Sequence, residues 1–101
     1  MKYIKIEWKR AHLNEPHTIL IEIDDDRMEV KRIEQYKNGK SDFASKTLNQ
    51  GEAILGDYPF LDLEEYNARN AEIDDLWEED LLASEISKSE FYRNWKVKTV
   101  K

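Results

Sequence analysis

The stretch from residue 18 to residue 41 constrains the fold of this chain more than any other. Isoleucine occupies every second position over residues 19–23, which is the period of a strand with one buried face. The acidic run at residues 24–26 then favours a turn, because aspartate side chains accept hydrogen bonds from nearby backbone amides. A second apolar run follows, and Asn38-Gly39 ends it with a strong hairpin signal. We therefore expect a β-hairpin followed by a second tight turn, with the rest of the chain packed on it.

Flanking segments extend this hairpin into a sheet. Residues 3–8 alternate in the same way, so one set of side chains should face the core. That set is Ile4, Ile6 and Trp8. Pro16 cannot donate to a β-ladder and indicates a loop, and residues 43–44 fit a short fourth strand. The expected sheet is an antiparallel meander of about four strands.

The expected third strand, Met28–Tyr36, changes phase along its length. Met28 and Val30 fall on one face, whereas Ile33 falls on the other. A β-bulge adds one residue to a strand and re-aims the side chains beyond it. We therefore expect a bulge near residues 31–32.

The second half of the chain predicts helices. Asp62 and Glu65 have the spacing of a capping box, in which side chains satisfy the exposed amides of the first helical turn. Residues 73–81 have apolar side chains at helical spacing and predict an amphipathic helix or turn. Those side chains belong to Ile73, Leu76, Trp77 and Leu81. A second capping box, at residues 87–90, precedes Phe91 and Trp95, which share one helix face.

Together these segments predict an α+β fold, in which C-terminal helices pack on one face of the meander sheet. One core should then hold side chains from both the sheet and the last helix. Its expected members are Trp8, Ile21 or its neighbour Leu20, Val30, Phe91 and Trp95. A chain of 101 residues is expected to form a single domain over residues 1–101.

Composition excludes several classes of protein. The chain has no cysteine, so neither a disulfide framework nor a cysteine-based zinc site can form. No stretch approaches the roughly 20 apolar residues of a membrane span, and the N-terminus lacks a signal-peptide core. A cytoplasmic location is therefore expected.

Nothing in the sequence indicates catalysis, a metal site or a cofactor. The two histidines, His12 and His17, have no fixed metal-ligand spacing and are expected on the surface. The run at residues 24–26 lacks the spacing and the glycine of a calcium loop and is expected to be a solvated turn. Neither a nucleophile elbow nor a phosphate-binding glycine loop is present. We expect a protein that is not an enzyme.

Charge is distributed unevenly along the chain. Residues 1–56 carry equal numbers of basic and acidic side chains. Residues 57–90 carry two basic and twelve acidic side chains, a net charge of −10, and residues 91–101 carry a net charge of +4. An acidic block repels phosphate and attracts a basic surface, so direct binding of nucleic acid is not expected.

The acidic block has two interpretations. It can be a solvated helix face that keeps a small domain soluble. It can also be a binding surface, because Trp77 stands among the acids as an aromatic residue does at many interfaces. The candidate partner-binding residues are Asp74, Asp75, Trp77, Glu78, Glu79 and Asp80. Trp77 can equally be a core residue.

Several segments, taken in order, resemble a family of small bacterial proteins. They are YIKIEW at residues 3–8, NEP at 14–16, IEIDDDRMEVKRIEQYKNGK at 21–40 and EISKSEF at 85–91. The family opens with a similar YIKVEW strand, continues with a D-E-P loop and an acidic hairpin, and ends in a helix of pattern E-I-S/T-x-E-E-F-x-x-W. Residues 85–95 match that helix, with Ser89 where an acid is usual. The resemblance implies a single domain without catalytic residues, and some relatives look like immunity proteins encoded beside toxin genes.

Our leading hypothesis is an immunity protein that binds and neutralises a cognate bacterial toxin, a nuclease of a contact-dependent inhibition system. A nuclease presents a basic cleft to its substrate, and a small acidic domain can occupy that cleft. Complementary charge would speed association, and buried aromatic side chains would slow release. The rival hypothesis is a small-molecule-binding domain or enzyme that uses a sheet face near His12, His17 and Arg27.

Overall fold

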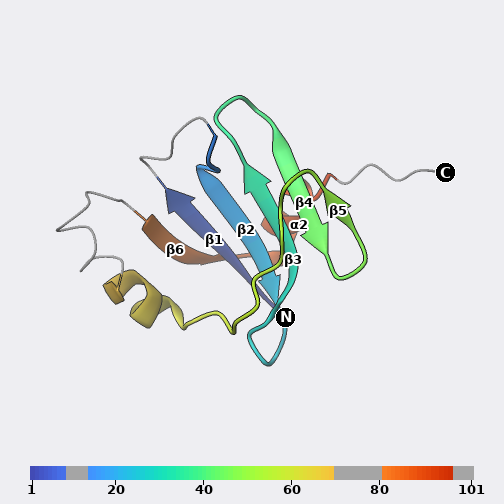
Figure 1. The fold of residues 1–101 in the computed structure, drawn as a ribbon. Helices are drawn as coiled ribbons and strands as arrows, with labels where there is room; N and C mark the ends of the chain where they lie inside the picture. The colour runs from blue at the N-terminus through green and yellow to red at the C-terminus, as the bar shows by residue number, and fades with distance from the viewer. Residues whose placement is uncertain (9–13, 70–80, 97–101) are drawn as a thin grey trace.

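A computed structural model describes residues 1–8, 14–69 and 81–96, which form one antiparallel sheet with helical segments on its two faces (Figure 1). In this described part, the sheet has six strands in the order β5-β4-β3-β2-β1-β6. The strands are β1 (Lys2–Trp8), β2 (Thr18–Ile23), β3 (Glu29–Gln35), β4 (Ser41–Ser45), β5 (Asn49–Gln50) and β6 (Leu81–Ile86). Helix α2 spans Lys88–Asn94, and a further helical segment covers residues 63–69.

Strands β1 to β4 form the predicted meander, since each pairs antiparallel with the next along the chain. Two further strands were not predicted: β5 pairs briefly with β4, and β6 pairs with β1 at the other edge of the sheet. The prediction of helical structure as far as Leu81 is wrong at its end, because Leu81 begins β6 opposite Trp8. There it packs against the apolar face of the sheet. The rest of that predicted segment, residues 73–80, lies outside the described residues.

Both predicted turns are present. Asp24 Oδ1 accepts hydrogen bonds from the backbone amides of Asp26 and Met28, at 2.9 and 3.0 Å, and these bonds close the turn between β2 and β3. Between β3 and β4, Gly39 has a φ of 87°, a conformation that residues with side chains rarely adopt. The hairpin on which the prediction rested is therefore confirmed.

The pairing of β2 with β3 contains a register shift. Glu22 is opposite Lys31 and Ile23 is opposite Glu29, which leaves Val30 as an extra residue in β3. The predicted bulge is therefore present, just before the expected position. As the extra residue, Val30 is only partly buried.

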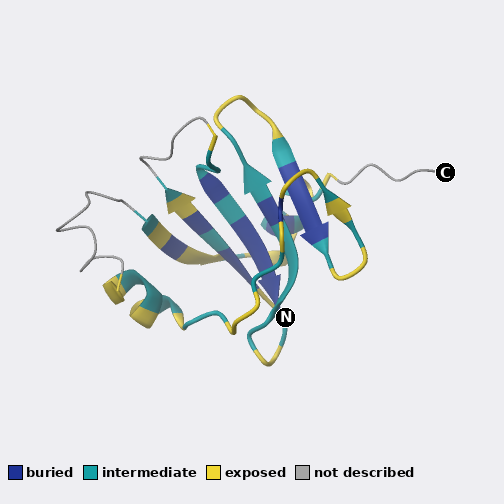
Figure 2. Ribbon diagram, viewed as in Figure 1, coloured by how far each residue is buried: buried dark blue, intermediate teal, exposed yellow. Residues whose placement is uncertain are grey.

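Both faces of the sheet are covered, which corrects the expectation of a single core on one face. Buried residues are concentrated on β1, β2 and β4, whereas β3 is mostly only partly buried (Figure 2). The cluster on the α2 side contains Tyr3, Leu20, Ile33, Phe43 and Phe91. The cluster on the opposite side contains Ile4, Ile6, Ile21, Ile23 and Ala83. Leu20 and Ile21, expected as alternatives, are thus both buried on opposite faces, and Trp8 and Val30 belong to neither cluster.

The C-terminal helix α2 begins as predicted. Ser87 is its N-cap, and Ser87 Oγ accepts a hydrogen bond from the Glu90 amide at 3.0 Å. Phe91 is fully buried, and Trp95 packs edge-on against Phe43 with ring centroids 5.5 Å apart. Phe91 and Trp95 therefore share one core, as expected.

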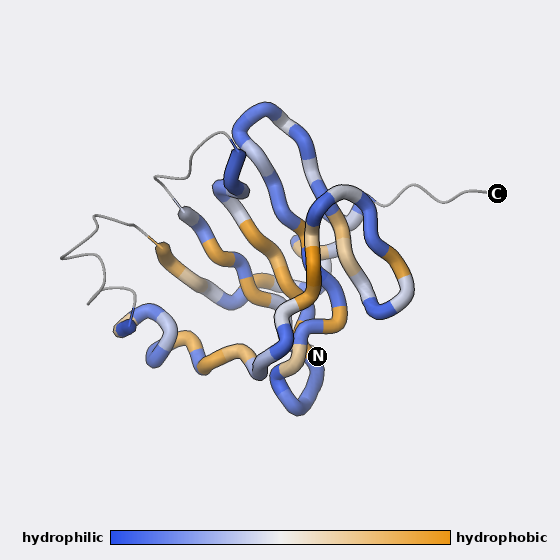
Figure 3. The backbone as a smooth tube through the Cα atoms, in the orientation of Figure 1, coloured by the Kyte–Doolittle hydropathy of each residue, from blue (hydrophilic) through white to orange (hydrophobic). Residues whose placement is uncertain are grey.

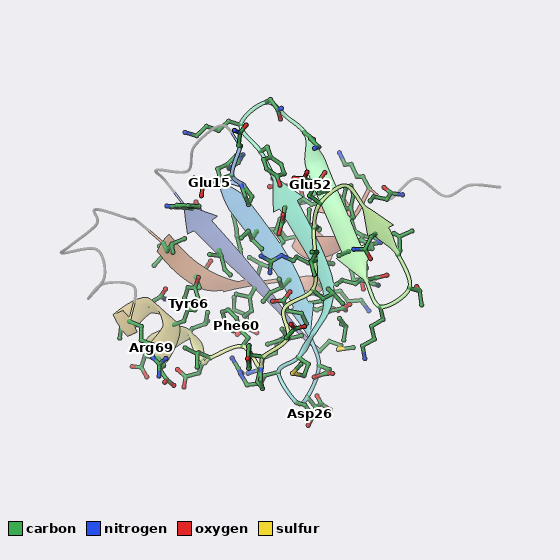
Figure 4. All side chains as sticks on the ribbon, viewed as in Figure 1. Glu15, Asp26, Glu52, Phe60, Tyr66 and Arg69 are labelled. Carbon is green, nitrogen blue, oxygen red and sulfur yellow. The ribbon has the colours of Figure 1, made fainter. Side chains whose placement is uncertain are left out.

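Residues 53–62, which we call the strap, cover the other face together with the helical segment that follows them (Figure 1). The chain is apolar where the strap enters that segment (Figure 3). The rings of Phe60 and Tyr66 stack 5.1 Å apart and lie close together in Figure 4, against the sheet cluster. The predicted cap is present, because Asp62 Oδ1 accepts a hydrogen bond from the Glu65 amide at 2.9 Å.

Asn67 covers the outer edge of β6. Its side-chain amide donates to the Ala83 carbonyl at 2.9 Å, and its Oδ1 accepts from the Ala83 amide at 2.8 Å. An edge strand otherwise presents unpaired backbone groups to which other chains can pair. At this position a side chain takes the place of a neighbouring strand.

Candidate functional site

Arg27 fixes the C-terminal end of the strap. Arg27 Nε and Nη2 donate hydrogen bonds to the carbonyls of Phe60 and Leu61, at 2.6 and 2.8 Å. The Phe60 amide donates back to the Arg27 carbonyl at 2.7 Å, and the guanidinium lies 5.9 Å from the centre of the Phe60 ring. Arg27 has a φ of 63°, which is uncommon for a residue with a side chain. Its side chain clamps the strap, so it is not available to the small-molecule site that the rival hypothesis expected.

The N-terminal half of the strap is held in a similar way. Asn49 Nδ2 donates to the carbonyl of the buried Ala53 at 2.9 Å, and the Gly56 amide donates to Glu29 Oε1 at 3.1 Å. A side chain at Gly56 would collide with the Glu29 carboxylate, since a Cβ there would lie 2.6 Å from it. Glycine therefore allows the strap to lie directly on β3.

Between these anchors the strap exposes large apolar side chains. Ile54 is 72% exposed and Tyr58 is 83% exposed. The acidic residues Asp57 and Asp62 are exposed on the strap, and Glu64 is exposed just beyond its end. We call these five residues the strap surface. An exposed tyrosine surrounded by charge is typical of protein-binding surfaces, where aromatic residues are enriched.

All six residues predicted to bind a partner lie outside the described residues. They are Asp74, Asp75, Trp77, Glu78, Glu79 and Asp80. The strap surface was missed by the sequence prediction, although part of it belongs to the same acidic block. Its apolar members have no distinguishing signal in the sequence, because Phe60 nearby, which packs against the sheet cluster, is equally apolar.

A polar network adjoins the strap on its side of the sheet. Arg32 pairs with Glu29 at 3.1 Å and with Glu34 at 2.7 Å. Burial opposes the charge of Arg32, but the two carboxylates outweigh this effect and raise the pKa of the guanidinium. Burial and the charge of Glu34 also raise the pKa of Tyr36 to about 12. These groups satisfy one another and hold β3 in place beside the strap.

A second polar network ties α2 to the sheet. The Tyr92 hydroxyl donates to Glu22 Oε2 at 3.0 Å, and Lys31 Nζ donates to the Tyr92 oxygen at 2.8 Å. Lys31 Nζ also lies 3.8 Å from Glu22 Oε1. Burial, and then a hydrogen bond to the buried Glu22, raise the pKa of Tyr3. The network satisfies a buried carboxylate and at the same time fixes the position of α2.

A hollow of about 390 Å³ lies where β1 ends and β2 begins. Its described lining residues are Glu7, Trp8, His17, Thr18 and Lys37. His17 Nδ1 and Thr18 Oγ1 are hydrogen-bonded at 2.7 Å, and the Trp8 amide donates to the His17 carbonyl at 2.8 Å. The indole Nε1 of Trp8 is buried without a hydrogen-bond partner among the described residues.

The structure separates the residues of the expected sheet-face site. His17 precedes β2 and Arg27 follows it, so the six-residue strand, about 20 Å long, lies between them. Figure 4 shows the same separation for Glu15 and Asp26, which lie at opposite ends of the sheet. His12 lies outside the described residues. The hollow thus combines His17 with residues of β1 and of the β3–β4 turn.

Within the described ranges, no group of three or more histidine, aspartate or glutamate side chains is placed to hold a metal ion. Of the helices in the same ranges, none has the length and apolar character needed to cross a membrane.

Comparison with protein families gives a match to a domain of unknown function (DUF6881) over residues 2–100. The match spans the sheet, the strap and α2. No curated protein and no solved structure matches the chain.

Proposed function

The chain belongs to the DUF6881 family, and we propose that it is an immunity protein that binds a cognate bacterial toxin and neutralises it. The observation that carries this proposal is the net charge of −10 over residues 57–90. The chain would act in the cytoplasm by covering the toxin's active surface. That role requires no catalytic residue, metal or cofactor.

The chemistry of the acidic block favours a nuclease of a contact-dependent inhibition system as the toxin. A nuclease must hold phosphates in a basic cleft, and clustered carboxylates are complementary to such a cleft. Electrostatic attraction of this kind accelerates association and weakens as salt is added, because the Debye length falls from about 10 Å at 0.1 M to about 3 Å at 1 M. Some relatives that the chain resembles look like immunity proteins, which agrees with this choice.

The strap surface supports the proposal from the described part of the chain. Tyr58 and Ile54 are exposed, but the backbone on either side of them is held by hydrogen bonds to β3 and to Arg27. A surface that is already ordered loses little conformational entropy when it binds. The strap is therefore suited to anchor a partner that the acidic block attracts.

A growth-protection assay with the toxin gene tests the proposal. Reversing Asp74 and Asp75 to lysine should abolish protection. The matched control reverses Asp25 and Asp26, which are exposed in the β2–β3 turn and give the same change in net charge. The control should retain protection, because that turn lies outside the acidic block.

The assay also has an outcome that contradicts the proposal. Full protection by the variant with reversed charges at residues 74 and 75, with the toxin still binding at an unchanged rate, would remove the acidic block from the interface. Measuring the association rate at low and high salt also tests, without mutation, whether charge attracts the toxin. A rate that does not depend on salt excludes charge attraction.

A further inference from the structure

We propose that Asn38 is a site of spontaneous covalent modification, at which asparagine converts to aspartate and isoaspartate, and that the folded β3–β4 turn restrains this conversion. Asn38 precedes Gly39, and it is the one asparagine of the chain that a glycine follows. Both residues are exposed in the turn, so water reaches them. The site is separate from the toxin-binding surface proposed above, and the two proposals are tested independently.

The reaction uses only the chain itself and water. The backbone nitrogen of Gly39 attacks Asn38 Cγ, and a bond forms between these two atoms. The bond from Cγ to Nδ2 breaks, and the Gly39 amide proton passes through solvent to the departing nitrogen, which leaves as ammonia. A five-membered succinimide ring remains. Water that opens the ring at Cγ gives aspartate, whereas water that opens it at the backbone carbonyl gives isoaspartate, in which the main chain runs through the former side chain.

The surroundings of Asn38 permit this reaction. Gly39 has no Cβ to hinder the attacking nitrogen, and a Cβ built there would meet nothing within 4 Å, so the space around the ring is open. Among the described residues, Asn38 Nδ2 has no hydrogen-bond partner that would hold it as it leaves. The other described asparagines precede residues with side chains, which hinder the attack. Those residues are Glu15, Gln50, Ala68 and Trp95.

Three hydrogen bonds of the folded turn oppose the attack. The Gly39 amide donates to the Tyr36 carbonyl at 3.0 Å, so the attacking nitrogen is engaged and retains its proton. Asn38 Oδ1 accepts from the Lys40 amide at 2.9 Å, which holds the side chain. The Tyr36 amide donates to the Lys40 carbonyl at 2.9 Å and closes the turn. The reaction requires these bonds to open, so its rate depends on local unfolding of the turn.

The two products affect the hairpin differently. Isoaspartate adds one atom to the main chain of the turn, whereas aspartate keeps the original length and an Oδ1 acceptor. Just beyond the turn, Gln35 is paired with Ser41, and the length of the connection sets this register. An extra main-chain atom disturbs that match. A single opening that lasts long enough for the reaction therefore becomes a permanent loss of stability in the hairpin.

The first test incubates the full-length protein in native buffer and in concentrated guanidinium chloride, at the same pH and temperature. Tandem mass spectrometry measures the conversion of each asparagine over time. In denaturant, Asn38 should convert faster than every other asparagine, and Gly39→Ala should slow it. In native buffer the rate at Asn38 should be lower by about tenfold or more, because hydrogen bonds must break first.

The second test compares the stability of the two products. Chromatography separates the isoaspartate form after incubation in denaturant and refolding. Asn38→Asp is its matched control, because aspartate and isoaspartate have the same mass and charge. The isoaspartate form should unfold at a lower denaturant concentration than Asn38→Asp, which should unfold close to the unmodified protein. The difference isolates the effect of the extra main-chain atom.

Three outcomes would overturn the inference. One is that Asn38 converts in denaturant no faster than Asn49 or Asn67, which would remove the site. Another is an equal rate at Asn38 in native buffer and in denaturant, which would show that the turn gives no restraint. The third is equal stability of the isoaspartate form and Asn38→Asp, which would separate the modification from the stability of the hairpin.

Discussion

The two faces of the sheet are covered in different ways. On the α2 side, Phe91, Trp95 and Tyr92 insert into the aromatic cluster or into the network around Glu22, so the helix is joined to the sheet through its side chains. On the opposite side, the strap is joined largely through its backbone, and Ile54 and Tyr58 are left in solvent. Side chains buried in a core are not available to a partner. We infer that the α2 side supplies stability and the strap side supplies recognition.

The largest effect on stability is expected for Phe91→Ala. Phe91 is fully buried and contacts Tyr3 and Trp95 through its ring. Its truncation should reduce the free energy of unfolding by about 3–5 kcal/mol, through lost burial and the cavity that remains. Urea denaturation measures the change. A loss below about 1 kcal/mol would mean that α2 contributes little to the core.

A smaller effect is expected for Tyr92→Phe. The substitution keeps the ring but removes the hydroxyl that lies between Glu22 and Lys31, so the buried carboxylate loses a donor. The expected cost is about 1–3 kcal/mol by urea denaturation. Tyr58→Phe is the matched control, since it removes the same atom from a side chain that is 83% exposed. Equal effects of the two substitutions would contradict the role given to the network.

Each face of the sheet has one tyrosine that should make stability depend on pH, Tyr3 on the α2 side and Tyr36 on the strap side. Burial and Glu22 raise the pKa of Tyr3, while burial and Glu34 raise that of Tyr36 to about 12. Unfolded tyrosine titrates near pH 10, so above about pH 10 the folded chain keeps protons that the unfolded chain releases. Stability should therefore be complete below that pH and decline as pH rises toward 12.

Unfolding midpoints measured across this alkaline range check the prediction. Tyr3→Phe and Tyr36→Phe should each make the decline shallower. If neither substitution alters the decline, the loss of stability at alkaline pH comes from other groups, such as lysines.

The smallest effect on stability is expected for Tyr58→Ala. The side chain is 83% exposed, so the free energy of unfolding should change by less than about 0.5 kcal/mol. Binding to the toxin should nevertheless weaken, mainly through faster dissociation, because an aromatic anchor contributes after encounter. Surface plasmon resonance measures the association and dissociation rates. A large loss of stability would show that Tyr58, and with it the strap side, also contributes to the stability of the fold.

The parts of the fold that could be predicted from sequence are those encoded by neighbouring residues. The Asp24 turn, the Gly39 turn and the Ser87 cap each depend on hydrogen bonds within a few positions. Strand β6 could not be predicted in this way. The spacing of Leu81 with the apolar residues before it fits a helix, and only pairing with distant β1 makes it a strand.

The candidate sites were less accessible to prediction, because their residues are positioned by distant partners. Arg27 holds the strap across 33 positions in sequence, and Tyr92 reaches Glu22 across 70. The alternation on β2 left open whether Ile21 or Leu20 faces the core, and it gave no sign that a helix would cover the face that carries Glu22. Of the two described members of the expected sheet-face set, His17 lines the hollow and Arg27 does not.

The pairing of β6 with β1 also has a consequence for biosynthesis. Of the described strands, β1 is made first and β6 last, yet the two are neighbours in the finished sheet. Until then, the outer edge of β1 has no strand beside it, and an open edge can pair with a neighbouring chain. The nascent protein therefore passes through a stage in which four strands of the meander can form while its first strand is still vulnerable to misassembly.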